Sequence, residues 1–140
     1  MRITFGRANE LGDFACFINP KYVVALPVVE FAVEKAVKNW NRGKRISKSL
    51  VMEILLYYSA TRQIEVAKKL TGIGKVVAVV LDEERFSMSG FKEENFKPDY
   101  DIEAIKEHYG ITDEELEIVG AEKLPLLLKE RIALFSLLGE

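Results

Sequence analysis

The sequence predicts an α+β fold, a single domain over residues 1–140 in which helices pack on a small, mostly antiparallel or mixed sheet and the C-terminal helix is apolar. Three observations lead to this prediction. A chain of 140 residues is long enough to bury one core. Its short apolar stretches are rich in the residues that strands prefer, and its longer ones repeat apolar residues at the helical period. No apolar run approaches the roughly 20 residues of a membrane-spanning helix.

The first third of the chain predicts two strands and a helix. Residues 1–5 (MRITF) and 14–18 (FACFI) are short apolar stretches separated by a polar turn, which favours two strands. Apolar residues then recur at helical spacing over residues 28–41. Pro27 suits the start of that helix, and Gly43 is expected to end it.

The middle of the chain predicts two helices and a central strand. Ser47 or Ser49 can cap a helix over residues 50–59, which is apolar nearly all round and is therefore expected to be buried on most sides. An amphipathic stripe predicts a further helix over residues 62–72. The valine-rich residues 75–82 predict a strand in the middle of the sheet.

The last third is predicted to begin with a loop. Residues 83–100 show no period and offer at most an edge strand. Short helices are expected over residues 101–110 and 112–120, the second beginning with a capping box in which Thr112 stands three residues before a glutamate. The final helix is predicted over residues 122–140, with a proline tolerated in its first turn.

The net charge of −2 hides an uneven distribution. Residues 1–75 hold 13 Lys and Arg against 6 Asp and Glu, whereas residues 76–140 hold 7 against 16. The cations concentrate in a stretch without any carboxylate, which we call the cationic segment: Lys35, Lys38, Arg42, Lys44, Arg45 and Lys48. Such a segment can bind phosphate, or it can simply be a solvated surface.

No residues form a recognisable catalytic or metal site. His108 is expected near a helix C-terminus, where a role in neutralising that end is favoured over catalysis, and Cys16 is expected in the core of a strand. Without a Cys/His cluster no zinc site is predicted, and the acids at residues 82–84 and 113–117 are expected to be solvated. We therefore predict a protein that is not an enzyme and needs no cofactor. The single cysteine suits the reducing cytoplasm.

The stretch SATRQI, residues 59–64, contains the only glutamine of the chain. Thr61 is expected to cap a helix that begins at Arg62, and the charge of arginine together with the amide of Gln63 suits phosphate and base edges. The alternative is that Arg62 and Gln63 brace the turn between two helices, for instance through Glu53 or Glu65.

A longer pattern includes this stretch: Ser49, Glu53-Ile54-Leu55, Ser59-Ala60-Thr61-Arg62-Gln63-Ile64, Ala67 and Gly72 before an apolar strand. It resembles the signature of the small kinase-binding subunit of the KEOPS complex, and helix order extends the resemblance over most of the chain. The motif often has glycine in place of Ala60. Alanine preserves the tight turn as long as the backbone there needs no positive φ.

The resemblance implies a non-catalytic subunit of the machinery that places threonylcarbamoyl on a tRNA adenosine. Its implied partners are the small atypical kinase/ATPase of the complex and, as in archaeal members, the single-stranded 3′ CCA end of tRNA. No membrane and no small-molecule substrate of its own are expected. The implied RNA-binding residues are the cationic segment together with Ser59, Ala60, Thr61, Arg62 and Gln63.

The C-terminal helix is apolar on more than one face, so it is either sunk in the core or shared with another protein. If the second face meets the kinase, one stripe chosen by spacing is Leu127, Arg131, Leu134, Phe135 and Leu138. The other face of the helix stays open as an equal alternative. Two other functions stay open. One is a pure protein-interaction subunit without RNA contact, and the other is a small enzyme built on the acids at residues 82–84.

Overall fold

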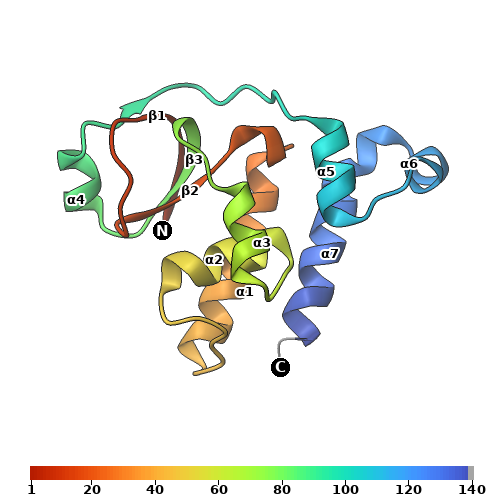
Figure 1. Cartoon of the computed structure of the whole chain (residues 1–140), viewed down its shortest axis with the longest axis horizontal. Coiled ribbons are helices and arrows are strands. Elements are labelled where there is room, and N and C mark those ends of the chain that lie inside the picture. The colour runs from red at the N-terminus through yellow and green to blue at the C-terminus, as the bar shows by residue number, and fades with distance from the viewer. Residues whose placement is uncertain (139–140) are drawn as a thin grey trace.

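The computed structural model describes residues 1–138 and confirms the α+β prediction (Figure 1). One sheet has the strand order β2 (Ala15–Ile18), β3 (Gly74–Val80), β1 (Arg2–Ala8) and β4 (Lys92–Glu93), and all neighbours are antiparallel. The valine-rich strand is central, as its composition predicts, because β3 pairs with a strand on each side. The edge strand considered for residues 83–100 is the two-residue β4.

Both faces of the sheet are covered. Val77 and Val79 of β3 belong to the main core on the helical side, whereas Val76, Ala78 and Val80 belong to a second cluster on the other side. This alternation follows from the two-residue period of a strand. It also explains why β3 shows no polar residue between Val76 and Val80.

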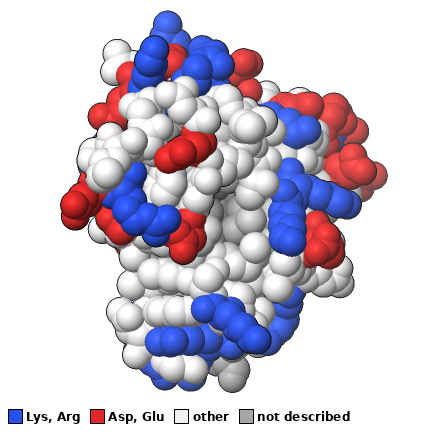
Figure 2. Space-filling view, turned by 60° about the vertical axis from the view of Figure 1, so that its left-hand side comes forward, with Lys and Arg blue, Asp and Glu red and all other residues white. Residues whose placement is uncertain are grey.

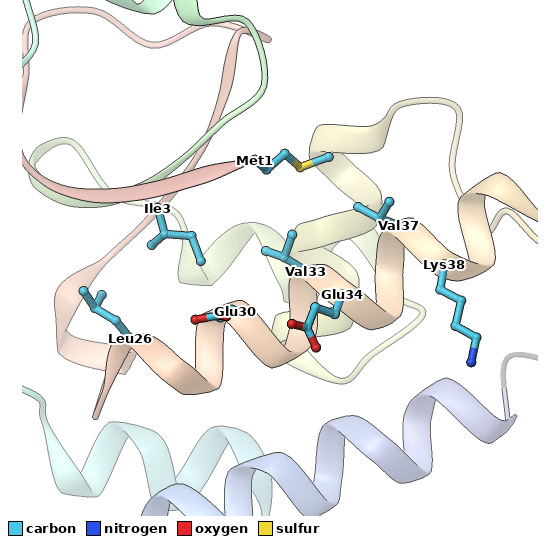
Figure 3. Close-up of a pocket in the computed structure, with 8 residues that line it drawn as sticks. All are labelled: Met1, Ile3, Leu26, Glu30, Val33, Glu34, Val37 and Lys38. Atoms are coloured by element: carbon cyan, nitrogen blue, oxygen red, sulfur yellow. The ribbon is translucent and has the colours of Figure 1, made fainter.

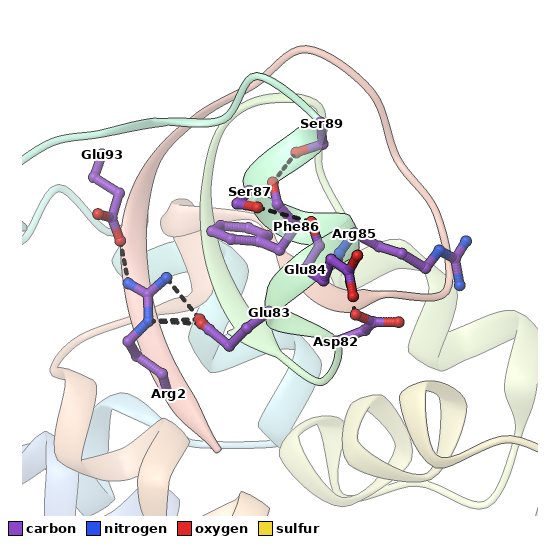
Figure 4. A network of polar contacts seen from close by, with 9 residues as sticks. All are labelled: Arg2, Asp82, Glu83, Glu84, Arg85, Phe86, Ser87, Ser89 and Glu93. Carbon is purple, nitrogen blue, oxygen red and sulfur yellow. Dashed lines mark hydrogen bonds and ion pairs between the residues drawn. The ribbon is translucent and has the colours of Figure 1, made fainter.

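The second face is covered by α4 (Glu83–Met88), where a loop was predicted. Asp82 accepts a hydrogen bond from the backbone N–H of Arg85 and caps the helix, and Phe86 is the one α4 residue buried against the sheet. Six residues with one buried side chain are too few to show a helical period. Arg2 of β1 links this helix to the edge strand β4 by bonding to both Glu83 and Glu93 (Figure 4).

The other helices lie on the first face and beyond it. They are α1 (Leu26–Asn41), α2 (Leu50–Ser59), α3 (Ile64–Ala67), α5 (Ile102–Tyr109), α6 (Asp113–Val119) and α7 (Leu124–Leu138). Helix α2 is surrounded by α1, β2, α3 and α7, which confirms that it is buried on most sides. Its cap is Ser49, whose hydroxyl accepts a hydrogen bond from the Met52 N–H at 3.1 Å.

The C-terminal third reaches its place through a long extended segment. Residues 94–101 cross from the sheet to α5 at the opposite end of the molecule (Figure 1). Helix α7 then returns alongside α1. Of the helix predicted over residues 122–140, the last two residues lie outside the described part of the chain. Within residues 1–138 no helix has the length and apolar character needed to span a membrane.

Candidate functional site at the C-terminus of α2

The turn that follows α2 is a helix C-cap built on alanine. We call residues 59–63 the junction. Ala60 has φ 52° and ψ 43°, and it is the only non-glycine residue with positive φ among the described residues. The Thr61 N–H bonds to the Leu56 carbonyl and the Ala60 N–H to the Tyr57 carbonyl, each at 3.1 Å. This pair of bonds defines a Schellman motif, in which glycine usually occupies the left-handed position. The backbone thus does require positive φ here, and Ala60 adopts it.

Two side chains of α5 bind the remaining free carbonyls of α2. The Tyr109 hydroxyl donates to the Tyr58 carbonyl at 2.6 Å, and Nε2 of His108 lies 2.8 Å from the Ser59 carbonyl. A carbonyl only accepts, so Nε2 carries the proton and donates it. Because the last four C=O groups of a helix have no partner inside it, these contacts complete the cap. His108 was predicted to neutralise the end of its own helix, but its ring is directed at the end of α2.

Burial shifts the pKa values of the groups behind the junction. It raises the pKa of the Tyr58 hydroxyl, which donates to the Tyr22 carbonyl at 2.6 Å, and raises that of Tyr109 well above its ordinary value. Burial also lowers the pKa of His108, with nearby Lys69 adding to the effect and the bond to Ser59 opposing it. All three groups are therefore held in their neutral forms near neutral pH.

After Ala60 come two exposed side chains, those of Arg62 and Gln63. The Thr61 hydroxyl accepts a hydrogen bond from the Gln63 N–H at 3.1 Å, and the helix begins only at Ile64. The prediction that Thr61 caps a helix starting at Arg62 is wrong, because this local turn uses the hydroxyl. The exposed side chains of Arg62 and Gln63 have no hydrogen bond or ion pair with another described residue.

The bracing alternative for Arg62 and Gln63 is also wrong. Glu65 pairs with Lys68 at 3.6 Å, while Glu53 is fully buried and serves the other end of α2. The Glu53 carboxylate accepts hydrogen bonds from the N–H groups of Ile46 and Ser47 at 2.8 Å and from the Ser47 hydroxyl at 2.7 Å. It therefore fixes the loop between α1 and α2. Sequence reasoning missed this role, although Glu53 is the only charged residue in the apolar stretch 50–59.

The loop that Glu53 fixes carries most of the cationic segment. Lys38, Arg42, Lys44, Arg45 and Lys48 are exposed, and Lys35 is half-buried. The Arg45 guanidinium lies 3.9 Å from the centre of the Trp40 ring, which leaves a flat cationic surface. In Figure 2 lysines and arginines gather at the lower end of the molecule, the end where Figure 1 places this loop. Acidic side chains concentrate higher on the same face.

A small pocket beside the junction brings two predicted sets of residues together. We call it the junction pocket; its volume is about 260 Å³. Its lining consists of Ser59, Ala60, His108, Tyr109, Arg131, Leu134, Phe135 and Leu138. The first two come from the predicted RNA-binding set, and the last four come from the predicted kinase stripe on α7.

The residues of the α7 stripe differ in their exposure. Leu127 and Phe135 are buried in the main core, where the Phe135 ring packs edge-on against Tyr57. Arg131 bonds to the Glu115 carboxylate at 2.9 Å. Leu134 and Leu138 are 53% and 83% exposed.

Exposed apolar side chains on α7 are not confined to the predicted stripe. Leu126 and Leu137 are exposed as well, on parts of α7 that spacing did not select. A helix that is apolar on more than one face does not reveal which face the core takes.

The acidic stretches have structural partners. Asp82 caps α4, Glu115 pairs with Arg131, and Asp113 bonds to Lys106. Within residues 1–138 no group of three His, Cys, Asp or Glu side chains is placed to hold a metal ion.

The chain matches a known protein family. The model of the family described as kinase binding protein CGI-121 matches residues 6–134, which cover both strands and helices of the fold and the whole junction. No curated protein matches the chain.

Proposed function

The chain belongs to the CGI-121 family of kinase-binding proteins, and on this premise we propose that it is the non-catalytic, kinase-binding subunit of a KEOPS complex in the cytoplasm. Its protein partner is the small atypical kinase/ATPase of that complex. Its RNA partner is the 3′ CCA end of the tRNA that receives threonylcarbamoyl on an adenosine. The subunit contributes binding and orientation, and the chemistry belongs to other subunits.

The junction carries the RNA part of the proposal. Arg62 and Gln63 are exposed and free of other contacts, while the backbone beside them is held by the completed cap of α2. An arginine presents charge and a planar face, and a glutamine presents a donor and an acceptor. Nucleotides in a single-stranded end have free base edges and faces, so they suit such side chains.

The cationic segment supports the same proposal from the other end of α2. A helix of ten residues is about 15 Å long, which a strand of a few nucleotides can span. The exposed cations can contact backbone phosphates, and the Arg45–Trp40 stack adds a flat surface for a base. Phosphate contacts would position the RNA, and the junction would receive its terminal bases.

A titration of tRNA with and without its CCA end tests the proposal. Intact tRNA should bind more tightly, and the affinity should fall steeply with salt. Arg62→Ala should weaken binding about tenfold, since a stacking or charged contact of this kind contributes about 1–3 kcal/mol. Arg7→Ala is the matched control, because Arg7 is exposed and lies on the sheet away from α2. Equal affinity for intact and trimmed tRNA would defeat the CCA assignment.

The second candidate function is a pure protein-interaction subunit without RNA contact. The exposed Leu134 and Leu138 at the rim of the junction pocket favour it, because they offer an apolar surface to a protein. Under this alternative Leu134→Glu abolishes kinase binding, whereas charge reversal of Lys44 and Arg45 leaves tRNA binding and modification unchanged. Loss of tRNA binding on that charge reversal would reject the alternative.

A further inference from the structure

A second apolar surface lies between β1 and α1, away from the junction. We call it the β1–α1 groove; its volume is about 690 Å³ (Figure 3). Ile3 points from β1 toward α1, and Val33 and Val37 point back toward β1. Leu26 closes the end at the start of α1. The groove thus has a continuous apolar floor that is open to solvent.

Two unpaired carboxylates border this floor. Glu30 and Glu34 are exposed, stand one helical turn apart on α1 and make no hydrogen bond or ion pair with another described residue. Like charges at this spacing destabilise a helix by a few tenths of a kcal/mol. By contrast, two acids on the opposite side of the sheet have a cationic partner, because Glu83 and Glu93 both form ion pairs with Arg2. A free acidic pair beside an open apolar floor is suited to a cationic, apolar partner.

The junction pocket is too small to bind both proposed partners, the RNA and the kinase. The predicted RNA-binding residues Ser59 and Ala60 and the predicted kinase residues Leu134 and Leu138 line the same pocket of about 260 Å³. Two macromolecules cannot both fill a space of that size. If RNA takes the junction pocket, the kinase needs another surface, and the groove offers an apolar floor that is not shared with the junction.

The shape of the groove favours a helix over a strand as its occupant. On the β4 side, β1 is paired only at Gly6 and Arg7, so its open edge is limited to Arg2–Thr4. Alternate residues of a strand direct their hydrogen-bonding groups to the same edge, so this stretch can offer very few bonds to an added strand. By contrast, Leu26 and Lys38 lie about 18 Å apart along α1, which matches roughly three turns of a docked helix.

We propose that the β1–α1 groove binds an amphipathic helix of the kinase partner. The helix places apolar side chains between Ile3 and Val33, and two Lys or Arg side chains one turn apart opposite Glu30 and Glu34. The exposed carboxylates of α1 complement cations on such a helix, which lays its apolar face into the groove. This inference rests on the proposed function for the identity of the partner as a kinase.

Charge reversal tests the groove without disturbing the core. The variant Glu30→Lys/Glu34→Lys should weaken association with the kinase at least tenfold, measured by isothermal titration calorimetry with the full-length chains. The matched control is Glu10→Lys/Glu117→Lys, which makes the same change in net charge at two exposed acids away from α1. Thermal unfolding of both variants checks that the fold is kept. Reversing the two facing cations of the kinase helix should restore the affinity of the groove variant.

Each other outcome has a distinct meaning. If the wild-type chain does not bind the kinase, the proposed function fails. If it binds and the groove variant binds equally well, the groove inference is overturned while kinase binding stands. Loss of binding in Leu134→Glu but not in the groove variant assigns the kinase to α7 and likewise overturns the inference. A homodimer of the wild-type chain in light scattering that the groove variant lacks would show that a second copy occupies the groove.

Discussion

Replacing Ala60 with glycine should stabilise this protein, although glycine weakens a helix when it stands in the interior. The reason is the left-handed backbone at Ala60, with φ 52°. An L-residue with a Cβ pays about 1–2 kcal/mol in that region, whereas glycine adopts it freely. Against this, glycine loses about 0.4–1 kcal/mol more conformational entropy on folding. The partly buried methyl group of Ala60 subtracts a few tenths of a kcal/mol more.

The net expectation is a gain of about 0.5 kcal/mol, which raises Tm by about 2 °C for a domain of this size. Urea unfolding measures the free energy, and a thermal melt measures Tm. Ala133→Gly is the matched control, because Ala133 is a half-exposed residue inside α7 and its replacement should cost about 1 kcal/mol. Ala60→Val should also be destabilising, since a β-branched side chain fits the left-handed region poorly.

The two alanine-to-glycine variants should therefore move stability in opposite directions. If Ala60→Gly costs about as much as Ala133→Gly, residue 60 does not have a left-handed backbone. The Schellman cap and the position of Arg62 deduced from it would then be wrong. If stability rises but tRNA binding is unchanged, glycine and alanine at residue 60 support the same junction shape.

Three further predictions concern the groups that hold α2 in place. Glu53→Ala should lower the free energy of unfolding by about 3 kcal/mol in urea titrations, because the partly buried N–H and hydroxyl donors of Ser47 lose a charged acceptor; stability equal to wild type would show that water replaces the carboxylate. Tyr109→Phe should cost about 1–2 kcal/mol, since the buried Tyr58 carbonyl loses its donor; a cost below 0.5 kcal/mol would contradict that bond. His108 has a lowered pKa in the folded state, so the unfolded state binds its proton more readily and stability should fall as pH drops below about 6.5. Unfolding curves from pH 8 to pH 5 should show a weaker decline in His108→Gln, and an unchanged decline would assign it to other groups.

Regular, long elements could be predicted from local pattern. The apolar stretch 50–59 had to be buried on most sides, and the valines of β3 had to lie in the middle of the sheet, because few polar residues interrupt either one. The short α4 was missed for the opposite reason, since one buried phenylalanine in six residues sets no period. The start of α3 was misplaced because a threonine hydroxyl serves a turn as readily as a helix cap.

For the candidate site too, some features followed from the sequence and others only from the tertiary structure. The sequence by itself determined that cations cluster before α2, that a small polar break follows it, and that the last helix has more apolar surface than one stripe can bury. Only the tertiary structure decided that Glu53 fixes the cationic loop, that His108 and Tyr109 complete the cap of α2, and that the junction and α7 share a pocket. Composition and period act between neighbours in sequence, whereas the hydrogen bonds that complete the cap of α2 join residues 49 and 51 positions apart, and only the packed fold brings such residues together.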